Sequence, residues 1–212
     1  MKTLLVAATE KELELIKEKL GKTDSIDFLV SGFGLTATAY SLTKHLQQKD
    51  YKLVLNVGIA GSIAKNLALG EVVEVVSEEF ADLGAEDKDQ FLSVFDLGFL
   101  KPNEQPFTEG KLLAKHELNL AELQLKKVAG LSINKVHGNT FSIEKLKQRY
   151  SKGVESMEGA ACFYVCGMEE VDCMQIRAIS NYVTVRNRAA WEIDLALRNL
   201  AETVAKLLKQ MK

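Results

Sequence analysis

The segment Leu4-Leu5-Val6-Ala7-Ala8, followed directly by Thr9-Glu10-Lys11-Glu12, contains the pattern that decides the fold. A short apolar run that gives way to an amphipathic one is typical of a buried strand followed by a helix. This alternation continues along most of the chain and predicts an α/β fold, with a central mixed, mostly parallel sheet flanked by helices in three layers. Strands are expected over 2–8, 27–31, 52–58, 71–78, 127–133 and 173–180, and helices over 10–20, 35–47, 143–150, 158–169 and 190–209.

Length and composition exclude several classes of protein. The chain has 212 residues, of which 47% are hydrophobic and only two are proline, so it can bury a full core as a single domain over 1–212. The net charge is −2 and no arginine precedes Arg149, so no basic stripe suited to nucleic acid is present. The first apolar run is too short for a signal peptide, and no later run approaches membrane-spanning length. We therefore expect a cytoplasmic protein with no membrane or nucleic-acid partner.

The cysteines do not predict a metal site. Cys162, Cys166 and Cys173 form an odd set, and the three histidines are scattered along the chain. This is not the spacing of a zinc site. The thiols are interpreted as reduced packing residues, and we expect neither a metal ion nor an organic cofactor.

Two glycine-rich segments predict turns near a ligand. Ser31-Gly32-Phe33-Gly34 follows a strand and opens a helix, so its backbone N–H groups could face an anion or a sugar hydroxyl. Gly58-Ile59-Ala60-Gly61-Ser62 follows a buried strand, at the edge where open α/β sheets bind substrates. Either segment could simply be a tight turn. The irregular region 84–110 is also expected to border a binding site.

The first glycine segment also matches a dinucleotide-binding fingerprint, Gly32-x-Gly34-x-x-Ala37. The match follows the second strand instead of the first, and Asp50 precedes a strand where the fingerprint needs an acid at a strand end. An NAD-binding module is therefore a rival interpretation from a different functional class.

Gly153-Val154-Glu155-Ser156-Met157-Glu158-Gly159-Ala160-Ala161 and Arg177-Ala178-Ile179-Ser180-Asn181 indicate the chemistry most directly. A ribose carbon that loses its base becomes electron-poor, so such a site needs a carboxylate near the sugar and a polar group on the departing ring. Glu158 and Asn181 could supply these two groups.

These segments are part of a wider resemblance. Across nearly its whole length, the chain resembles the nucleoside phosphorylase and nucleosidase family. The resemblance rests on the order and spacing of the motifs already quoted, together with Asn56-Val57, Phe80-Ala81-Asp82-Leu83-Gly84-Ala85-Glu86-Asp87, Val136-His137-Gly138, Ile179-Ser180-Asn181-Tyr182-Val183 and Arg186-Asn187-Arg188.

The resemblance implies a role for Glu12 and for the ribose-binding residues. Glu12 matches the acid that activates the attacking water in related nucleosidases, although Thr9-x-x-Glu12 also fits a capping box. Met157 and Glu158 match the pair that contacts the sugar, the carboxylate accepting from the 2′- and 3′-hydroxyls. An acidic residue at a helix N-terminus is the plainer interpretation of Glu158. Phe141 matches an aromatic residue that stacks on the purine, and its alternative is a core residue.

Asn181 departs from the family pattern. Members that act on 6-aminopurines usually carry Asp here, whereas an amide can donate to N7 or to a 6-oxo group, so the resemblance implies that hypoxanthine leaves. A plain turn residue at a strand end is the alternative. Phosphorylases of the family bind phosphate with arginines of the N-terminal half, which this chain lacks, and Ile59 stands where several relatives have a hydroxyl that contacts the nucleophile. Water is therefore the expected nucleophile.

The resemblance also implies a substrate with a carboxyphenyl-ketone tail on its 5′ side. Arg186 or Arg188 is the candidate partner of that carboxylate, although both could be solvated arginines. The rivals within the family are a nucleosidase for methylthioadenosine or S-adenosylhomocysteine and a purine nucleoside phosphorylase, and an idle nucleoside-binding module is a further alternative. Family members are commonly dimers or larger homo-oligomers.

Overall fold

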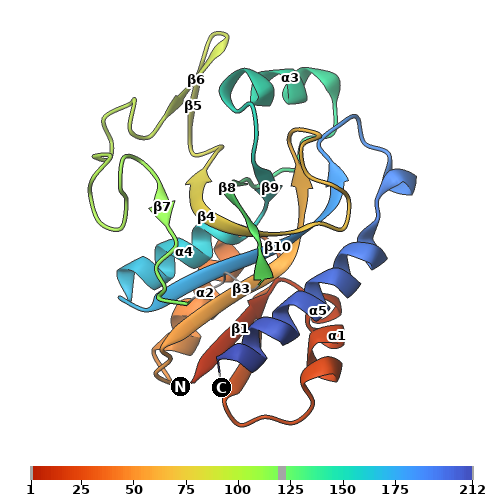
Figure 1. Ribbon diagram of the computed structural model, residues 1–212. Coiled ribbons are helices and arrows are strands. Elements are labelled where there is room, and N and C mark those ends of the chain that lie inside the picture. Colours follow the sequence, from red (N-terminus) through yellow and green to blue (C-terminus); the bar gives the residue numbers. More distant parts are fainter. Residues whose placement is uncertain (1, 119–122, 212) are drawn as a thin grey trace.

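The computed structural model describes residues 2–118 and 123–211. A central sheet runs through these residues with helices on both faces (Figure 1). The helices are α1 (Glu10–Leu20), α2 (Gly34–Leu46), α3 (Thr140–Arg149), α4 (Gly159–Met168) and α5 (Ile193–Gln210). The strands are β1 (Thr3–Ala7), β2 (Ile26–Val30), β3 (Leu53–Ser62), β4 (Val72–Phe80), β5 (Gly84–Asp87), β6 (Gln90–Ser93), β7 (Leu112–Leu113), β8 (Lys126–Ser132), β9 (Val154–Ser156) and β10 (Asp172–Tyr182).

The sheet is mixed and mostly parallel, as predicted. Its order is β10-β4-β8-β9-β3-β1-β2, with β7 on the side of β4. The antiparallel pairs are β10 with β4, β3 with β9 and β4 with β7. Because β10 also pairs with β3, the strands β10, β4, β8, β9 and β3 close into a ring. The sequence pattern did not predict this closure.

Helices cover both faces of the sheet because its strands are apolar on both sides. Successive side chains of a strand point to opposite faces. In β1, Leu5 packs into a core cluster that includes residues of α1 and α5, whereas Leu4 packs into one that includes residues of α2 and α4. The continuous apolar runs of the sequence are therefore strands buried on both faces.

The observed bounds of the helices lie close to the predicted ones. Local structure before α3 and α5 explains why these two helices start at different residues from those predicted. α3 starts at Thr140 instead of 143 because the Asn139 side chain accepts from Ser142 N–H at 2.9 Å. α5 starts at Ile193 instead of 190 because Arg188–Ala190 form a short 3-10 helix, η2. Asn187 caps that helix by accepting from Ala189 N–H at 3.2 Å.

The prediction of a turn at residues 58–62 is wrong, because β3 continues through Ser62. Gly58 pairs with Arg177, and Gly61 pairs with Asn181. A Cβ at position 58 would lie 2.2 Å from Arg177 Nη1, and one at position 61 would lie 3.0 Å from Asn181 Nδ2. The glycines therefore make room for side chains of the neighbouring strand instead of bending the chain.

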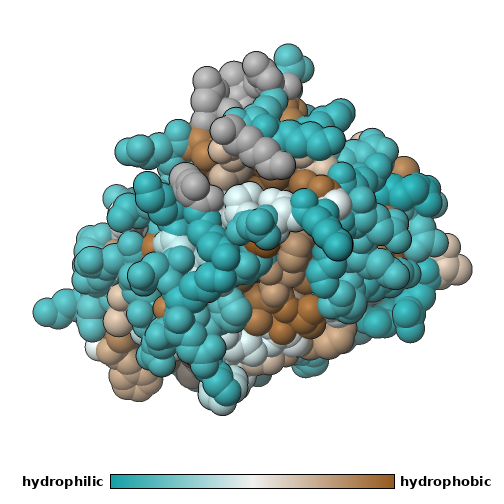
Figure 2. Space-filling view, turned by 90° about the horizontal axis from the view of Figure 1, so that it is seen from below, coloured by the Kyte–Doolittle hydropathy of each residue, from teal (hydrophilic) through white to brown (hydrophobic). Residues whose placement is uncertain are grey.

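The irregular region 84–110 contains the β5–β6 hairpin, which projects beside α3 (Figure 1). None of the helices among the described residues is long and apolar enough to cross a membrane. Figure 2 shows the end of the molecule away from this hairpin. Hydrophilic side chains cover most of it, and hydrophobic ones gather near its middle.

Candidate active site

Glu12 is a helix cap whose second oxygen reaches the sheet. Oε2 accepts from Thr9 N–H at 3.1 Å and from Thr9 Oγ1 at 2.9 Å, and Thr9 Oγ1 caps Glu12 N–H, so the capping box predicted as an alternative is present. Oε1 accepts from Ile59 N–H of β3 at 3.2 Å. The carboxylate is thus held from both sides, at the point where β1 ends and β3 passes.

Glu158 is a buried carboxylate that the start of another helix binds. It is 7% exposed and is the N-cap residue of α4, but it makes no side-chain cap on its own helix. Its Oε1 instead accepts from Gly34 N–H, in the first turn of α2, at 3.0 Å. The Ser31–Gly34 segment was predicted to present N–H groups to an anion, and Glu158 is the anion it binds. The partial positive charge of a helix N-terminus favours this contact.

The electrostatics of Glu158 reflect burial and three neighbours. Burial raises the pKa of this carboxyl above its ordinary value. The Arg177 guanidinium and the Gly34 N–H oppose that rise, and the negative charge of Glu12 adds to it. Glu12, Arg177 and Glu158 therefore lie close enough to influence one another.

Arg177 joins this group, although the sequence alone indicates no role for it. It lies on β10, is 1% exposed, and donates from Nη2 to Asn56 Oδ1 at 2.6 Å. A Cβ at Gly58 would collide with Arg177 and also lie 2.7 Å from Glu12 Oε1. An arginine in the middle of a buried strand is the signal that could have identified it, because an unpaired buried charge is costly.

Asn181 lies on β10 just after a shift in register between Ile179 and Asn181. Its Oδ1 accepts from Ser180 Oγ at 2.8 Å, and its Nδ2 donates to Tyr182 O at 3.2 Å. Because the Tyr182 carbonyl can only accept, it identifies Nδ2 as the NH₂ group, which keeps one further hydrogen to donate. Asn181 is a strand residue here and not the turn residue considered as its alternative.

The remaining predicted site residues lie around this centre. Met157 is half-buried and its backbone N–H bonds the Glu158 carboxyl. The side chain of Ile59 packs against the core cluster that contains Leu55. Phe141 is 67% exposed in the first turn of α3, with Lys145 Nζ 4.8 Å from its ring centre, so it is not a core residue.

Arg186 and Arg188 lie in the exposed loop that follows β10. The Arg186 backbone N–H donates to Gly138 O at 2.9 Å, which ties this loop to the segment before α3. The Arg186 guanidinium lies 5.2 Å from the Trp191 ring centre. Arg188 is in η2 and is exposed.

His137, beside Gly138, is held by a buried acid for which the sequence alone indicates no role. Glu155 on β9 is 5% exposed, and one of its oxygens accepts from His137 N–H at 3.1 Å. Its other oxygen bonds His137 Nδ1. This pair fixes the segment that leads to Asn139 and Phe141.

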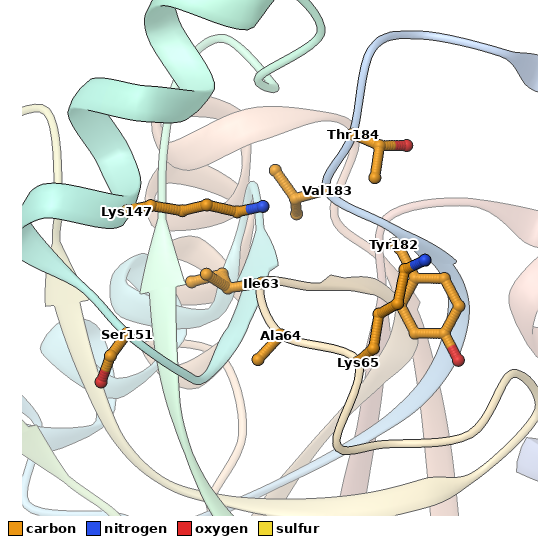
Figure 3. A pocket seen from close by; sticks show the side chains of 8 residues that line it. All are labelled: Ile63, Ala64, Lys65, Lys147, Ser151, Tyr182, Val183 and Thr184. Carbon is orange, nitrogen blue, oxygen red and sulfur yellow. The ribbon is translucent and has the colours of Figure 1, made fainter.

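Two cavities lie beside the predicted segments, but neither has Glu12, Glu158 or Asn181 in its wall. Figure 3 shows one of about 430 Å³ where β3 and β10 end, lined by residues that include Ile63, Tyr182 and Val183. Lys147 extends from α3 toward Val183 across it (Figure 3). A second cavity, of about 570 Å³, lies between the β5–β6 hairpin and α3 and includes His137 in its wall. The region 84–110 thus borders a cavity beside the predicted purine-binding segment.

Cys162, Cys166 and Cys173 are free and buried, as expected of packing residues. Their sulfur atoms lie within 4.8 Å of one another. Sequence spacing hides this grouping because Cys162 and Cys166 are one helical turn apart on α4, while Cys173 comes from β10.

Known proteins resemble this chain over most of its length. Residues 16–212 match the family model described as "Phosphorylase superfamily". A futalosine hydrolase of Streptomyces coelicolor is 34% identical over 190 residues, covering 87% of this chain and 79% of that protein. A futalosine hydrolase of Acidothermus cellulolyticus is 32% identical over 190 residues, covering 87% of this chain and 76% of that protein.

The fold is also similar to that of solved structures. A 5′-methylthioadenosine/S-adenosylhomocysteine nucleosidase of Neisseria meningitidis, in complex with methylthio-immucillin-A, has a TM-score of 0.81 at 18% identity. The match covers 99% of this chain and all of that one.

Proposed function

This chain belongs to the phosphorylase superfamily, and on that premise we propose that it hydrolyses the N-glycosidic bond of futalosine. The products are dehypoxanthine futalosine and hypoxanthine, a step of the alternative menaquinone pathway. The observation that carries the proposal is the amide of Asn181, which stands near the end of β10 where 6-aminopurine enzymes of the family usually have an acid. The same strand carries Arg177, which lies beside Glu12 and Glu158. We also propose that the enzyme works in the cytoplasm, as a homodimer or a larger homo-oligomer.

In this proposal the two acids act on the sugar and on the water. Glu158 accepts hydrogen bonds from the 2′- and 3′-hydroxyls of ribose, and its charge stabilises the cationic sugar as the bond stretches. Glu12 takes a proton from a water molecule whose oxygen bonds to C1′. Its Oε1 is held near Gly58 and Arg177, and Ile59 N–H fixes its position. No metal or cofactor is needed for these steps.

Asn181 acts on the leaving base. The electrons of the broken C1′–N9 bond pass into the purine, whose developing negative charge needs a hydrogen-bond donor at N7. The Asn181 NH₂ group supplies it, because Tyr182 O uses only one of its two hydrogens. The purine then takes up a proton from solvent to become hypoxanthine, and Glu12 gives the proton that it took from water back to solvent. An amide also suits the 6-oxo group of hypoxanthine better than the 6-amino group of adenine.

Purified protein is expected to release hypoxanthine from futalosine at the same rate with and without phosphate. The physical reason is that only five arginines are present, none before Arg149, and that Arg177 is buried and bonded to Asn56, so phosphate has few charged partners. Incubation with futalosine, inosine and methylthioadenosine, followed by analysis of the released base, measures this. A rate that requires phosphate would indicate a phosphorylase, and adenine as the only released base would indicate the methylthioadenosine nucleosidase that the Neisseria fold supports as an alternative. Intact nucleosides in every incubation would indicate a binding module.

The carboxylate tail of futalosine is proposed to pair with Arg186 or Arg188. Replacing the partner arginine with Gln should raise the futalosine KM by about tenfold or more, because a hydrogen bond to a charged group is lost. The KM for inosine, which lacks the tail, should not change. Arg198→Gln, at an exposed position of α5, is the matched control. Unaltered futalosine KM values in both loop variants would remove this contact from the proposal.

A further inference from the structure

Glu78 is a fully buried carboxylate that no step above uses. It lies on β4, and β8 and β10 flank that strand in the sheet. Its Oε1 accepts from Gln175 Nε2 at 2.8 Å, and its Oε2 accepts from Ser132 Oγ at 2.9 Å. A buried carboxylate is costly unless its partners are well placed, so both oxygens need these donors.

The contact with Ser132 links Glu78 to the start of α4. Ser132 Oγ accepts from Ala160 N–H at 2.8 Å. The first N–H groups of a helix have no partner within the helix, and Ser132 supplies one from outside. Because Ala160 follows Glu158 by two residues, two hydrogen bonds connect Glu78 to the turn that holds the proposed ribose-binding carboxylate.

Two glycines make this arrangement possible. A Cβ at Gly159 would lie 2.0 Å from Glu78 Oε1, and one at Gly130 would lie 2.3 Å from the same atom. Real Cβ atoms do not approach so closely, so Glu78 occupies the space that side chains at these positions would fill. Glu78 therefore packs directly against the backbone of Gly159, the first residue of α4, which directly follows Glu158.

The charges around Glu78 connect it to the same site. Arg177 on β10 and Cys162 on α4 face it, while β8 contributes the neutral Ser132. Burial raises the pKa of Glu78 to about 7, against the opposing effects of Gln175 and Arg177, and Cys162 adds to the rise. Both Glu78 oxygens accept hydrogen bonds, which fits the ionised form. Protonation turns one of them into a donor and disturbs one of the two contacts.

We propose that Glu78 is a positioning residue for the hydrolysis proposed above, on which this inference rests. Through Ser132 and the first turn of α4, it fixes the Glu158 carboxylate against the ribose without touching the substrate. The ionised form holds this turn, so the contribution of Glu78 to activity is present above about pH 7 and is lost as the pH falls below it.

Glu78→Gln tests this inference, with Glu79→Gln as the matched control. Glu79 is the next residue on β4 and bonds Lys111 and Tyr150 instead of the α4 turn. In Glu78→Gln, hydrogen exchange of the Ala160 amide should become about fivefold faster, because the hydrogen bond between residue 78 and Ser132, which connects residue 78 to Ala160, is weakened. A displacement of Glu158 of the order of 1 Å should lower kcat/KM for futalosine by about 10²-fold. The limb of the kcat–pH profile near pH 7 should disappear.

Glu79→Gln should change none of these three readouts. Ser132→Ala, which removes the connecting hydroxyl and keeps Glu78, should accelerate Ala160 exchange in the same direction and gives a second test if Glu78→Gln does not fold. Unchanged Ala160 exchange, or a pH profile identical to that of the control, would overturn the positioning role. Base release by the wild-type enzyme tests the proposed function separately, since amide exchange needs no substrate. A wild-type enzyme that releases no base would end the catalytic part of this inference as well.

Discussion

Glu12→Gln is expected to lower kcat by about 10²–10⁴-fold while leaving the protein folded, because an amide cannot take a proton from the attacking water. The substitution separates the two roles of Glu12. A capping box accepts Gln as well as Glu at this position, so the amide side chain can still receive the Thr9 N–H. Single-turnover rates of hypoxanthine release, together with thermal unfolding, provide the measurement.

Two controls complete this test. Thr9→Ala removes the cap on Glu12 N–H and should lower the free energy of unfolding by about 0.5–2 kcal/mol, with a much smaller effect on kcat. Glu14→Gln makes the same chemical change at an exposed position of α1 and should alter neither quantity. A Glu12→Gln enzyme of near-normal activity would leave Glu12 as a helix cap only.

Asn181→Ala should reduce kcat by about 10²–10³-fold, because it removes a donor aimed at negative charge that develops on the leaving base. The loss should appear in the rate of bond cleavage more than in KM, since the charge is present mainly in the transition state. Pre-steady-state release of hypoxanthine from futalosine measures this step. An unchanged rate would remove Asn181 from the mechanism.

Asn181→Asp tests the choice of base at the same position. A protonated Asp can donate to N7 while its other oxygen accepts from a 6-amino group, so this variant should shift relative kcat/KM toward an adenine nucleoside such as methylthioadenosine. Ser180 contacts Oδ1 and remains available to either side chain. A variant that keeps the wild-type ratio between futalosine and methylthioadenosine would show that Asn181 does not select the base.

Much of the fold could be predicted because local patterns determine it. The apolar β1 and the amphipathic α1 follow each other with Thr9 as a cap, and the observed bounds agree with the predicted ranges. The closure of the sheet could not be predicted, because it depends on β10 pairing with both β3 and β4 across large sequence separations. The two-residue strand β7 and the three-residue strand β9 are too short to show a period.

The site was predictable only in part, for a related reason. The positions of Glu12 and Glu158 near helix starts follow from sequence, but their contacts with Ile59 and Gly34 come from other elements. Gly58 was interpreted as a turn because the sequence does not show that Arg177 lies against it. Buried polar contacts between distant strands leave little local signal.

A crystal structure of the Glu12→Gln enzyme with futalosine bound tests the proposed mechanism most directly. We expect the Glu158 carboxylate on the ribose 2′- and 3′-hydroxyls, and the Asn181 NH₂ group at N7 of the purine. A water molecule should lie between the substituted side chain at position 12 and C1′, on the face opposite the base. Futalosine bound elsewhere, for example in the cavity beside Tyr182 with no contact to Glu158, would contradict the mechanism.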